Sequence, residues 1–466
     1  MEFKKEFNEW QNKLSSVNMD FLEFVEKNPG CLDLANFKEL ELNDKLFTLQ
    51  PWPTFISRET RETFREAGEG LFKLIKSITG RIFNFDPQKM SQFYGLPLNI
   101  IKLQMEGVTP GHIENLISRG DFIISRSGLK CIEYNVTPAL GGREISFWES
   151  LYYKTPLIMK FLEEYHIKPT NENLFVLFLE HIVTSTLKVF AKELDELNAA
   201  LIFKENIEEQ GDPDSVNALN YFKEHYRNVL KGMAPQIGGD IFLCDFASLK
   251  HVNNRLFYKG KQIHTVVESN FGLVSPAVFS TFKSGNIALF NGPISNIFSN
   301  KLNMVLLSDY HTYNVYSEEE KRIIDAYVPW TRKMVPGPTY YKNEYVENLE
   351  SFVRNNREKM VLKPPLGYGG DGISVGVKTS DTKWEEAVKT AIKEKHWLVQ
   401  EMVEGNPGVY QTGEIGYDSH DMVWGLFVFG SRYCGAWVRV MPQDNNKGVV
   451  NCHQGATVSI IFDVEK

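Results

Sequence analysis

The sequence predicts an α+β protein of several domains, and three observations support this fold class. A chain of 466 residues is too long for one ordinary hydrophobic core. Helical patterns and patterns of short apolar strands fill separate stretches instead of alternating regularly. Residues 423–462 read as antiparallel strands. Changes of pattern divide the chain into five parts, residues 1–90, 91–150, 151–235, 236–315 and 316–466.

Composition and charge restrict the class of protein. Hydrophobic residues make up 42% and charged residues 24%, and no apolar run reaches the roughly 18 residues of a membrane span. The net charge of −8 argues against nucleic acid as the main partner, because phosphate backbones are bound by basic faces. Five scattered cysteines lack zinc-site spacing, and the N-terminus lacks an apolar segment of signal-peptide length. We therefore expect a cytoplasmic protein with reduced thiols and no membrane partner. The sequence leaves open whether the protein forms a homodimer.

Two stretches are rich in helix-forming residues with apolar side chains at helical spacing. In residues 1–90 these side chains include Phe64 and Leu71. Residues 151–235 repeat the pattern, with His181 on an apolar face, where a histidine more often belongs to the packing than to a ligand site. Neither stretch shows a chemical motif.

A candidate metal site lies in a predicted β-hairpin. Its strands span residues 122–125 and 129–134 and are joined by a Ser-Gly turn. Pairing of the two strands places Asp121 beside Glu133. Asn135 is two residues further along the strand than Glu133, so its side chain projects from the same face. Two carboxylates and an amide oxygen are the hard ligands that Mg²⁺ takes together with water and phosphate oxygens. A surface hairpin with a solvated Asp121 and Glu133 is the alternative.

Residues 236–315 have the pattern of a small α/β domain. Three short apolar runs read as buried strands: residues 241–244, 263–267 and 287–290. After this domain, Ser317 followed by three glutamates predicts a capped helix. Arg332 and Lys333 come next, and these two cations either face a phosphate or are simply solvated.

A glycine-rich hairpin in the C-terminal part is the most informative stretch. Residues 360–362 and 373–377 read as its two strands. Lys363 ends the first strand. Four glycines between the strands can take positive φ and bring backbone N–H groups against an anion: Gly367, Gly369, Gly370 and Gly372. We interpret this hairpin as a loop that covers a phosphate.

Other glycine motifs fit the hairpin poorly. The four glycines satisfy G-x-G-x-x-G, but a strand follows where a dinucleotide-binding fold requires a helix. A protein-kinase loop has its lysine after the glycines and needs H-R-D and D-F-G, which this sequence lacks. A Walker A loop needs a Gly-Lys-Ser/Thr that does not follow. An ordinary glycine-rich hairpin remains the alternative.

The elements after the hairpin resemble the nucleotide lobe of the ATP-grasp ligases. A predicted helix over residues 384–395 and the strand Trp397-Leu-Val-Gln-Glu-Met-Val follow the glycines. In that family ATP lies between two antiparallel sheets. The resemblance implies that Lys363 contacts the α- and β-phosphates, with Lys333 as a further cation. It also implies that the strand after the helix contacts adenine and ribose through Gln400, Glu401 and Val403.

The metal motif of that family stands at the front of this chain. An Asp followed by Glu-x-Asn-x-x-Pro is present as Asp121, Glu133, Asn135 and Pro138, with Arg119 two residues before the aspartate. The chain therefore resembles the circularly permuted ATP-grasp proteins, such as the synthetase domain of glutathionylspermidine synthetase. The resemblance implies an ATP-grasp fold in permuted order, with a small α/β central domain and added helical segments.

The resemblance implies a ligase that joins a carboxylate to an amine, with ATP and Mg²⁺ as cofactors. The carboxylate attacks the γ-phosphate and forms an acyl phosphate, and the amine then forms the amide. Arg119 and Arg439 would hold the carboxylate and the acyl phosphate. Amino acids, short peptides and polyamines are the substrate classes to consider. Two alternatives stay open: a nucleotide-binding protein of this fold without turnover, and an ATP-dependent kinase.

Overall fold

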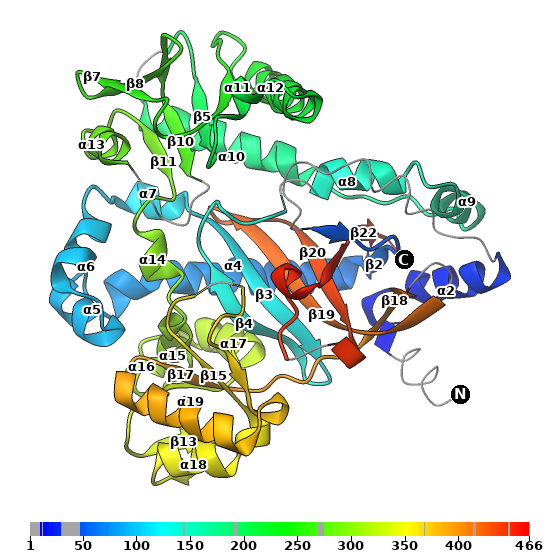
Figure 1. Ribbon diagram of the computed structural model, residues 1–466, viewed down its shortest axis with the longest axis vertical. Coiled ribbons are helices and arrows are strands. Elements are labelled where there is room, and N and C mark those ends of the chain that lie inside the picture. Colours follow the sequence, from blue (N-terminus) through cyan, green and yellow to red (C-terminus); the bar gives the residue numbers. More distant parts are fainter. Residues whose placement is uncertain are drawn as a thin grey trace.

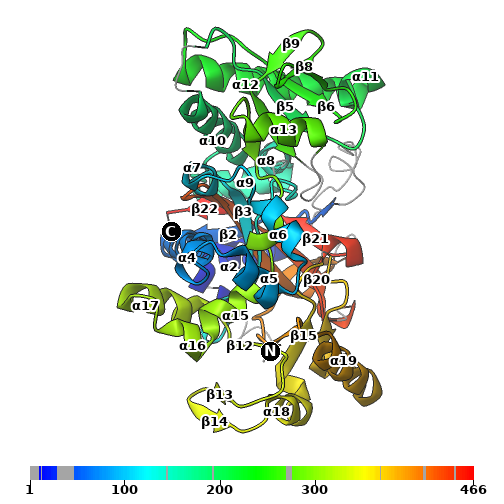
Figure 2. The ribbon, with the colours of Figure 1, turned by 90° about the vertical axis from the view of Figure 1, so that its left-hand side faces the viewer.

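The computed structural model describes residues 10–11, 13–28, 47–142, 145–190, 194–268, 275–367, 369–412, 416–445 and 448–465. Three main sheets follow one another along the long axis of the molecule (Figure 1, Figure 2). A parallel sheet lies at the top of both views, a large, mostly antiparallel sheet in the middle, and a small antiparallel sheet toward the bottom. This mixed arrangement agrees with the predicted α+β class.

The large sheet has seven strands and is assembled from distant parts of the chain. Its strands are, in order, β1 (Thr48–Leu49), β21 (Thr457–Ser459), β20 (Arg432–Pro442), β19 (Gly416–Phe429), β3 (Ile117–Ser125) and β4 (Gly128–Asn135), and β18 (Gly408–Thr412) also pairs with β19. Helix α4 (Arg58–Arg81) covers one face (Figure 1). On that face Phe72 stacks on Tyr134 with ring centroids 5.6 Å apart. The other face is free to carry polar side chains.

The small antiparallel sheet has the strand order β12 (Thr331–Lys333), β17 (Leu398–Glu401), β15 (Met360–Lys363) and β16 (Ser374–Val375). Helices α18 (Leu349–Asn355) and α19 (Asp381–Glu394) cover one face, where Leu362 and Val399 pack against Trp384. The predicted glycine hairpin is confirmed. Its second strand is shorter than expected, because the chain enters a single 3₁₀ turn at Gly376–Lys378. Only glycine fits at the start of this turn, since a Cβ at Gly376 would lie 1.8 Å from Arg357 O.

The parallel sheet has the order β11 (Ala288–Phe290), β10 (Thr265–Glu268), β5 (Ala199–Ile202) and β6 (Ile241–Cys244). The three strands expected between residues 236 and 315 are confirmed. Strand β5, however, lies in the stretch 151–235 that was expected to be helical, so the sheet crosses the boundary drawn near 235. Four buried apolar residues are too few for periodicity to distinguish a strand from a helix.

The remaining elements connect and cover these sheets. The remaining helices are α2 (Val17–Lys27), α5 (Pro87–Tyr94), α6 (Leu98–Met105), α7 (Pro110–Glu114), α8 (Ile145–Tyr152), α9 (Pro156–Glu164), α10 (Leu174–Val189), α11 (Ile207–Gln210), α12 (Pro213–Met233), α13 (Pro276–Lys283), α14 (Ser295–Phe298), α15 (Leu302–Ser308), α16 (Tyr310–Tyr313) and α17 (Glu318–Tyr327). The remaining strands are β2 (Thr54–Ser57), β7 (Lys250–Val252), β8 (Arg255–Tyr258), β9 (Lys261–Ile263), β13 (Thr339–Tyr341), β14 (Glu344–Val346) and β22 (Ile461–Val464).

Several local expectations can be checked directly. The predicted cap at Ser317 forms a capping box with Glu320 at the start of α17. His181 packs against Phe290 and Phe429, as expected for a histidine on an apolar face. Four cysteines are free thiols, as expected, and Cys31 lies outside the described residues; the four are Cys131, Cys244, Cys434 and Cys452. Within the described ranges, no helix combines the length and apolar character needed to cross a bilayer.

Candidate functional site

The β3–β4 hairpin presents charged and amide side chains on the free face of the large sheet. Asp121 pairs with Glu133 and Arg119 pairs with Asn135, so the four residues occupy neighbouring positions on one face. A bulge beside Asp121 leaves Ile132 outside the regular ladder. The predicted juxtaposition of Asp121 and Glu133 therefore holds in the backbone register.

Asp121 is buried between two arginines. Arg119 donates from Nε to Asp121 Oδ1 at 2.8 Å and from Nη2 to Oδ2 at 3.2 Å. Arg439 Nη2, from β20, lies 2.9 Å from Asp121 Oδ2. Burial by itself would raise the pKa of the Asp121 carboxyl, but the two guanidinium groups outweigh it and hold that pKa below its usual value. Asp121 is therefore an anion at neutral pH, and the two arginines are fixed around it.

Arg439 keeps a donor for a further group. It is 4% exposed, and its Nε has no hydrogen-bond partner within the described residues. A buried donor without a partner is costly, so this N–H marks a position where a ligand acceptor would be stabilised. Gly425 makes room for the arrangement, because a Cβ there would meet Trp437 Nε1 at 2.3 Å and Arg119 Cδ at 2.8 Å.

Lys363 joins the small sheet to the β3–β4 hairpin. Its Nζ donates to Ile132 O at 2.8 Å and to Gln400 Oε1 at 2.7 Å. Burial lowers the pKa of Lys363 to about 8, despite the nearby Glu133 carboxylate. Lys363 and Ile132 are 231 residues apart in the sequence. The structure thus brings together the two stretches that the sequence marked independently.

Lys301 is a second lysine at this junction, and the sequence did not mark it as a site residue. It precedes α15 and is 6% exposed. Its Nζ lies 3.1 Å from Glu133 Oε1 and donates to Gly367 O at 2.8 Å. Two signals were available: the Asn300-Lys301 pair resembles the central domain of the permuted ATP-grasp proteins, and the lysine directly precedes a strongly apolar helix, where burial of its charge requires partners.

The glycine loop has the backbone conformation that its composition predicts. The four glycines have φ values of 136°, 70°, 87° and 71° in the order Gly367, Gly369, Gly370 and Gly372. A Cβ at Gly370 would meet Val449 Cγ1 at 2.7 Å and Gln454 Nε2 at 3.0 Å. Gln454 Nε2 also donates to Gly369 O at 3.3 Å. The loop therefore lies against the segment after β20.

The face of the small sheet that bears Lys363 also bears Lys333 and Gln400. Lys333 and Lys363 are both opposite Leu398, and Gln400 is two residues further along β17. Burial lowers the pKa of Lys333 to about 8, and its Nζ donates to Phe93 O at 2.5 Å. These three side chains and Thr331, which accepts from Gln400 Nε2 at 3.2 Å, form a polar row.

Other candidates lie elsewhere on this lobe. Glu401 is on the opposite face, where Tyr341 OH donates to its Oε1 at 2.9 Å, so its side chain does not join the polar row. Arg332 also points to that face and donates to Thr339 Oγ1 at 2.9 Å and Ser308 O at 2.8 Å, so its interpretation as a phosphate ligand is not supported. Val403 follows β17 and is half-buried.

The charges at the junction favour a polyanion. Four cations, Lys301, Lys363, Arg119 and Arg439, face two carboxylates, which leaves a net charge of about +2. In the described part of the chain no cluster of three or more His, Cys, Asp or Glu residues could hold a metal alone. Glu133, Asp121 and Asn135 carry oxygen atoms of the kind that Mg²⁺ takes together with phosphate oxygens and water. In this structure both Asp121 oxygens are bound by arginines, and Asn135 Nδ2 donates to Asp121 Oδ2 at 3.3 Å.

No protein-family model and no curated protein matches the sequence. A solved structure does match: a glutathione synthetase-like effector from Globodera pallida, in its apo form. The match has a TM-score of 0.58 at 13% identity and covers 96% of this chain and 97% of the other. The chain therefore has a glutathione synthetase-like fold over almost its whole length.

Proposed function

We propose that the protein is an ATP-dependent ligase that joins a carboxylate to an amine through an acyl phosphate. The observation that carries the proposal is the junction of Lys363 with the β3–β4 hairpin, since two half-sites become one only there. The large sheet, built from β3 and β4 at the front of the chain and β19 and β20 at its end, supports an ATP-grasp fold in circularly permuted order. The glutathione synthetase-like fold supports the same class of reaction.

In the proposed reaction the triphosphate lies between the two antiparallel sheets. Lys363 and Lys301 balance the phosphate charge, and the glycine loop excludes water from the reacting groups. Lys333 and Gln400 line the nucleotide face of the small sheet. Glu133, Asp121 and Asn135 would hold Mg²⁺, which neutralises charge on the phosphates when bound.

The carboxylate substrate is placed by the arginines. A carboxylate oxygen attacks the γ-phosphorus and ADP leaves. The amine nitrogen then attacks the acyl carbon, phosphate leaves and the nitrogen loses a proton. Arg439 Nε is free to donate to the acyl phosphate, and Arg119 and Asp121 hold the Arg439 guanidinium in position. The two arginines would act mainly by orienting the carboxylate substrate and by neutralising its negative charge.

The direct test is a screen of amino acids, short peptides and polyamines in pairs. We expect ADP release that depends on both an acid and an amine, with the condensed amide detected by mass spectrometry. Lys363→Ala should abolish this turnover, whereas Lys359→Ala, at an exposed lysine just before the same strand, should leave it unchanged. Turnover within a few-fold of wild type in Lys363→Ala would refute the assignment.

A nucleotide-binding protein without turnover is the second candidate. One observation favours it: Lys301 and the two arginines already neutralise Glu133 and Asp121 without a metal. In that case nucleotide would bind, yet no combination of acid and amine would accelerate ADP release. A kinase would instead give a phosphorylated product and no amide.

A further inference from the structure

Lys301 and Glu133 form an ion pair at the junction of the two lobes. Lys301 Nζ lies 3.1 Å from Glu133 Oε1, and only 6% of the lysine side chain is exposed. The backbone fixes the lysine, because Lys301 N donates to Pro365 O at 2.9 Å and the buried helix α15 begins at the next residue. Glu133 belongs to the proposed Mg²⁺ site. An ammonium group therefore already contacts a carboxylate that the metal would need.

The charge at this junction opposes the binding of a metal ion alone. Both Asp121 oxygens are bound by arginines, and the four cations and two carboxylates leave a net charge of about +2. A divalent cation by itself would raise this charge to about +4 in a buried place, where like charges repel strongly. A magnesium triphosphate carries a net charge of about −2 and would bring the junction to about zero. Charge therefore favours entry of the metal together with the nucleotide.

We propose that Lys301 keeps Glu133 from the metal until a nucleotide arrives, so that the metal binds only together with the triphosphate. The inference rests on the proposed function, which gives Glu133 its role. An N–H of Lys301 passes from the Glu133 carboxylate to a phosphate oxygen when the nucleotide binds. Without phosphate, a metal on Glu133 would leave a buried ammonium without its counter-charge, which is costly. Lys301 is therefore a positioning residue that sets the order of binding.

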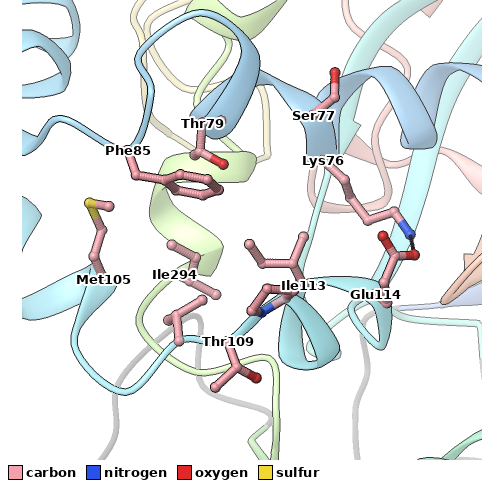
Figure 3. A pocket seen from close by; sticks show the side chains of 12 residues that line it. Lys76, Ser77, Thr79, Phe85, Met105, Thr109, Ile113, Glu114 and Ile294 are labelled. Carbon is pink, nitrogen blue, oxygen red and sulfur yellow. Dashed lines mark hydrogen bonds and ion pairs between the residues drawn. The ribbon is translucent and has the colours of Figure 1, made fainter.

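A second buried lysine offers a matched comparison. Lys76, on α4, lies 3.0 Å from Glu114 Oε2 and donates to Gly430 O at 2.9 Å, so its partners are of the same kinds as those of Lys301 (Figure 3). Its side chain is also 6% exposed. Glu114, however, is 68% exposed, and α4 covers the face of the large sheet opposite to the candidate site. Water already screens the Glu114 charge, so removing Lys76 should create no buried site for a metal.

The test uses the full-length protein with Mn²⁺ as the probe, because Mn²⁺ takes the same oxygen ligands as Mg²⁺. The relaxation rate of water protons distinguishes Mn²⁺ on the protein from Mn²⁺ on free nucleotide. Wild type without nucleotide should show no saturable binding below about 1 mM, and a non-hydrolysable ATP analogue should produce one site per chain. Lys301→Met should bind Mn²⁺ without nucleotide at least about ten-fold more tightly than wild type, whereas Lys76→Met should not.

Adding Glu133→Gln to Lys301→Met should remove the new site, which would place it at Glu133. Lys301→Gln is a second neutral variant, and the comparison of wild type with and without the analogue decides even if neither variant folds. Equal Mn²⁺ affinity of wild type in both states, no Mn²⁺ binding in either state, or no gain in a folded neutral variant would overturn the inference. Turnover that depends on acid and amine would survive such a result, whereas failure of the proposed function would appear as absence of that turnover.

Discussion

Burial and phosphate binding have opposite effects on the pKa of Lys363. Burial removes water from the ammonium group and lowers its pKa to about 8, and Lys333 on the same face also has a pKa of about 8. A nearby triphosphate would favour the charged form of both lysines. The pKa of each group would then rise when the nucleotide binds.

We therefore expect ATP binding to take up protons between about pH 8 and pH 9 and to weaken as the pH rises through this range. Near pH 6 both lysines are already protonated, so the proton uptake that depends on them should vanish. Calorimetry in buffers of different ionisation enthalpy measures the proton count. Lys363→Met should reduce the uptake, and Lys359→Met should not. Binding without proton exchange at every pH would contradict the placement of these lysines beside phosphate.

Glu133 is the residue on which metal binding should depend most. Both Asp121 oxygens are contacted by arginine, whereas Glu133 has one ion pair, with Lys301, and a partly exposed side chain. Glu133→Gln removes one negative charge from a cation site that takes few protein ligands. The Mg²⁺ concentration that gives half-maximal turnover should rise at least about ten-fold. Glu404→Gln, at an exposed glutamate after β17, is the control.

At the scale of elements, the glycine hairpin offers a contrast between two of its own residues. Gly367 and Gly370 both have positive φ, so alanine is strained at either position. Only at Gly370 would the new Cβ also collide, with Val449 and Gln454, whereas at Gly367 the nearest atom is 3.7 Å away. We expect Gly370→Ala to lower kcat/KM for ATP by roughly 10- to 100-fold and Gly367→Ala by clearly less. Equal effects would mean that contact with the 449–454 segment is irrelevant.

Elements with local signals were predictable from the sequence. The glycine hairpin, the β3–β4 hairpin and the capped α17 carry turn residues or caps that act within a few residues. Strands β1 and β2 carry no such signal, because they form only by pairing with β21 and β22 from the other end of the chain. The sequence therefore indicated only two helical parts in residues 1–90, separated at Pro51-Trp-Pro53, and neither strand beside this break was expected.

The same distinction applies to the candidate site. Asp121, Glu133, Asn135 and Lys363 stand in motifs with fixed spacing, which is why the sequence could mark them. Lys301 belongs to an Asn-Lys pair that resembles the central domain of the permuted ATP-grasp proteins, but that resemblance assigned it no role. Its role depends on contacts with Glu133 and Gly367 that only the folded chain creates. Glu401 was marked by its neighbour Gln400, but alternation along β17 turns the two side chains to opposite faces.

At the scale of the whole molecule, the proposal requires that segments far apart in the sequence act as one site. Lys363 contacts Ile132 across 231 residues, and Lys301 connects Glu133 to the glycine loop. Strands β19 and β20 complete the sheet that β3 and β4 begin. A ligand shared by both lobes should therefore slow local opening in both lobes together.

Hydrogen exchange of the full chain with Mg²⁺ and a non-hydrolysable ATP analogue tests this directly. We expect slower exchange in peptides from the β3–β4 hairpin and from residues 360–375, with the same dependence on nucleotide concentration. The parallel sheet of β5, β6, β10 and β11 serves as the internal control, because none of the proposed ATP or Mg²⁺ ligands lies on its strands. Lys363→Ala should remove both effects at once, since the lysine contacts the nucleotide and the hairpin. Protection confined to one of the two stretches would show that they do not share a ligand, and the ligase assignment would then fail.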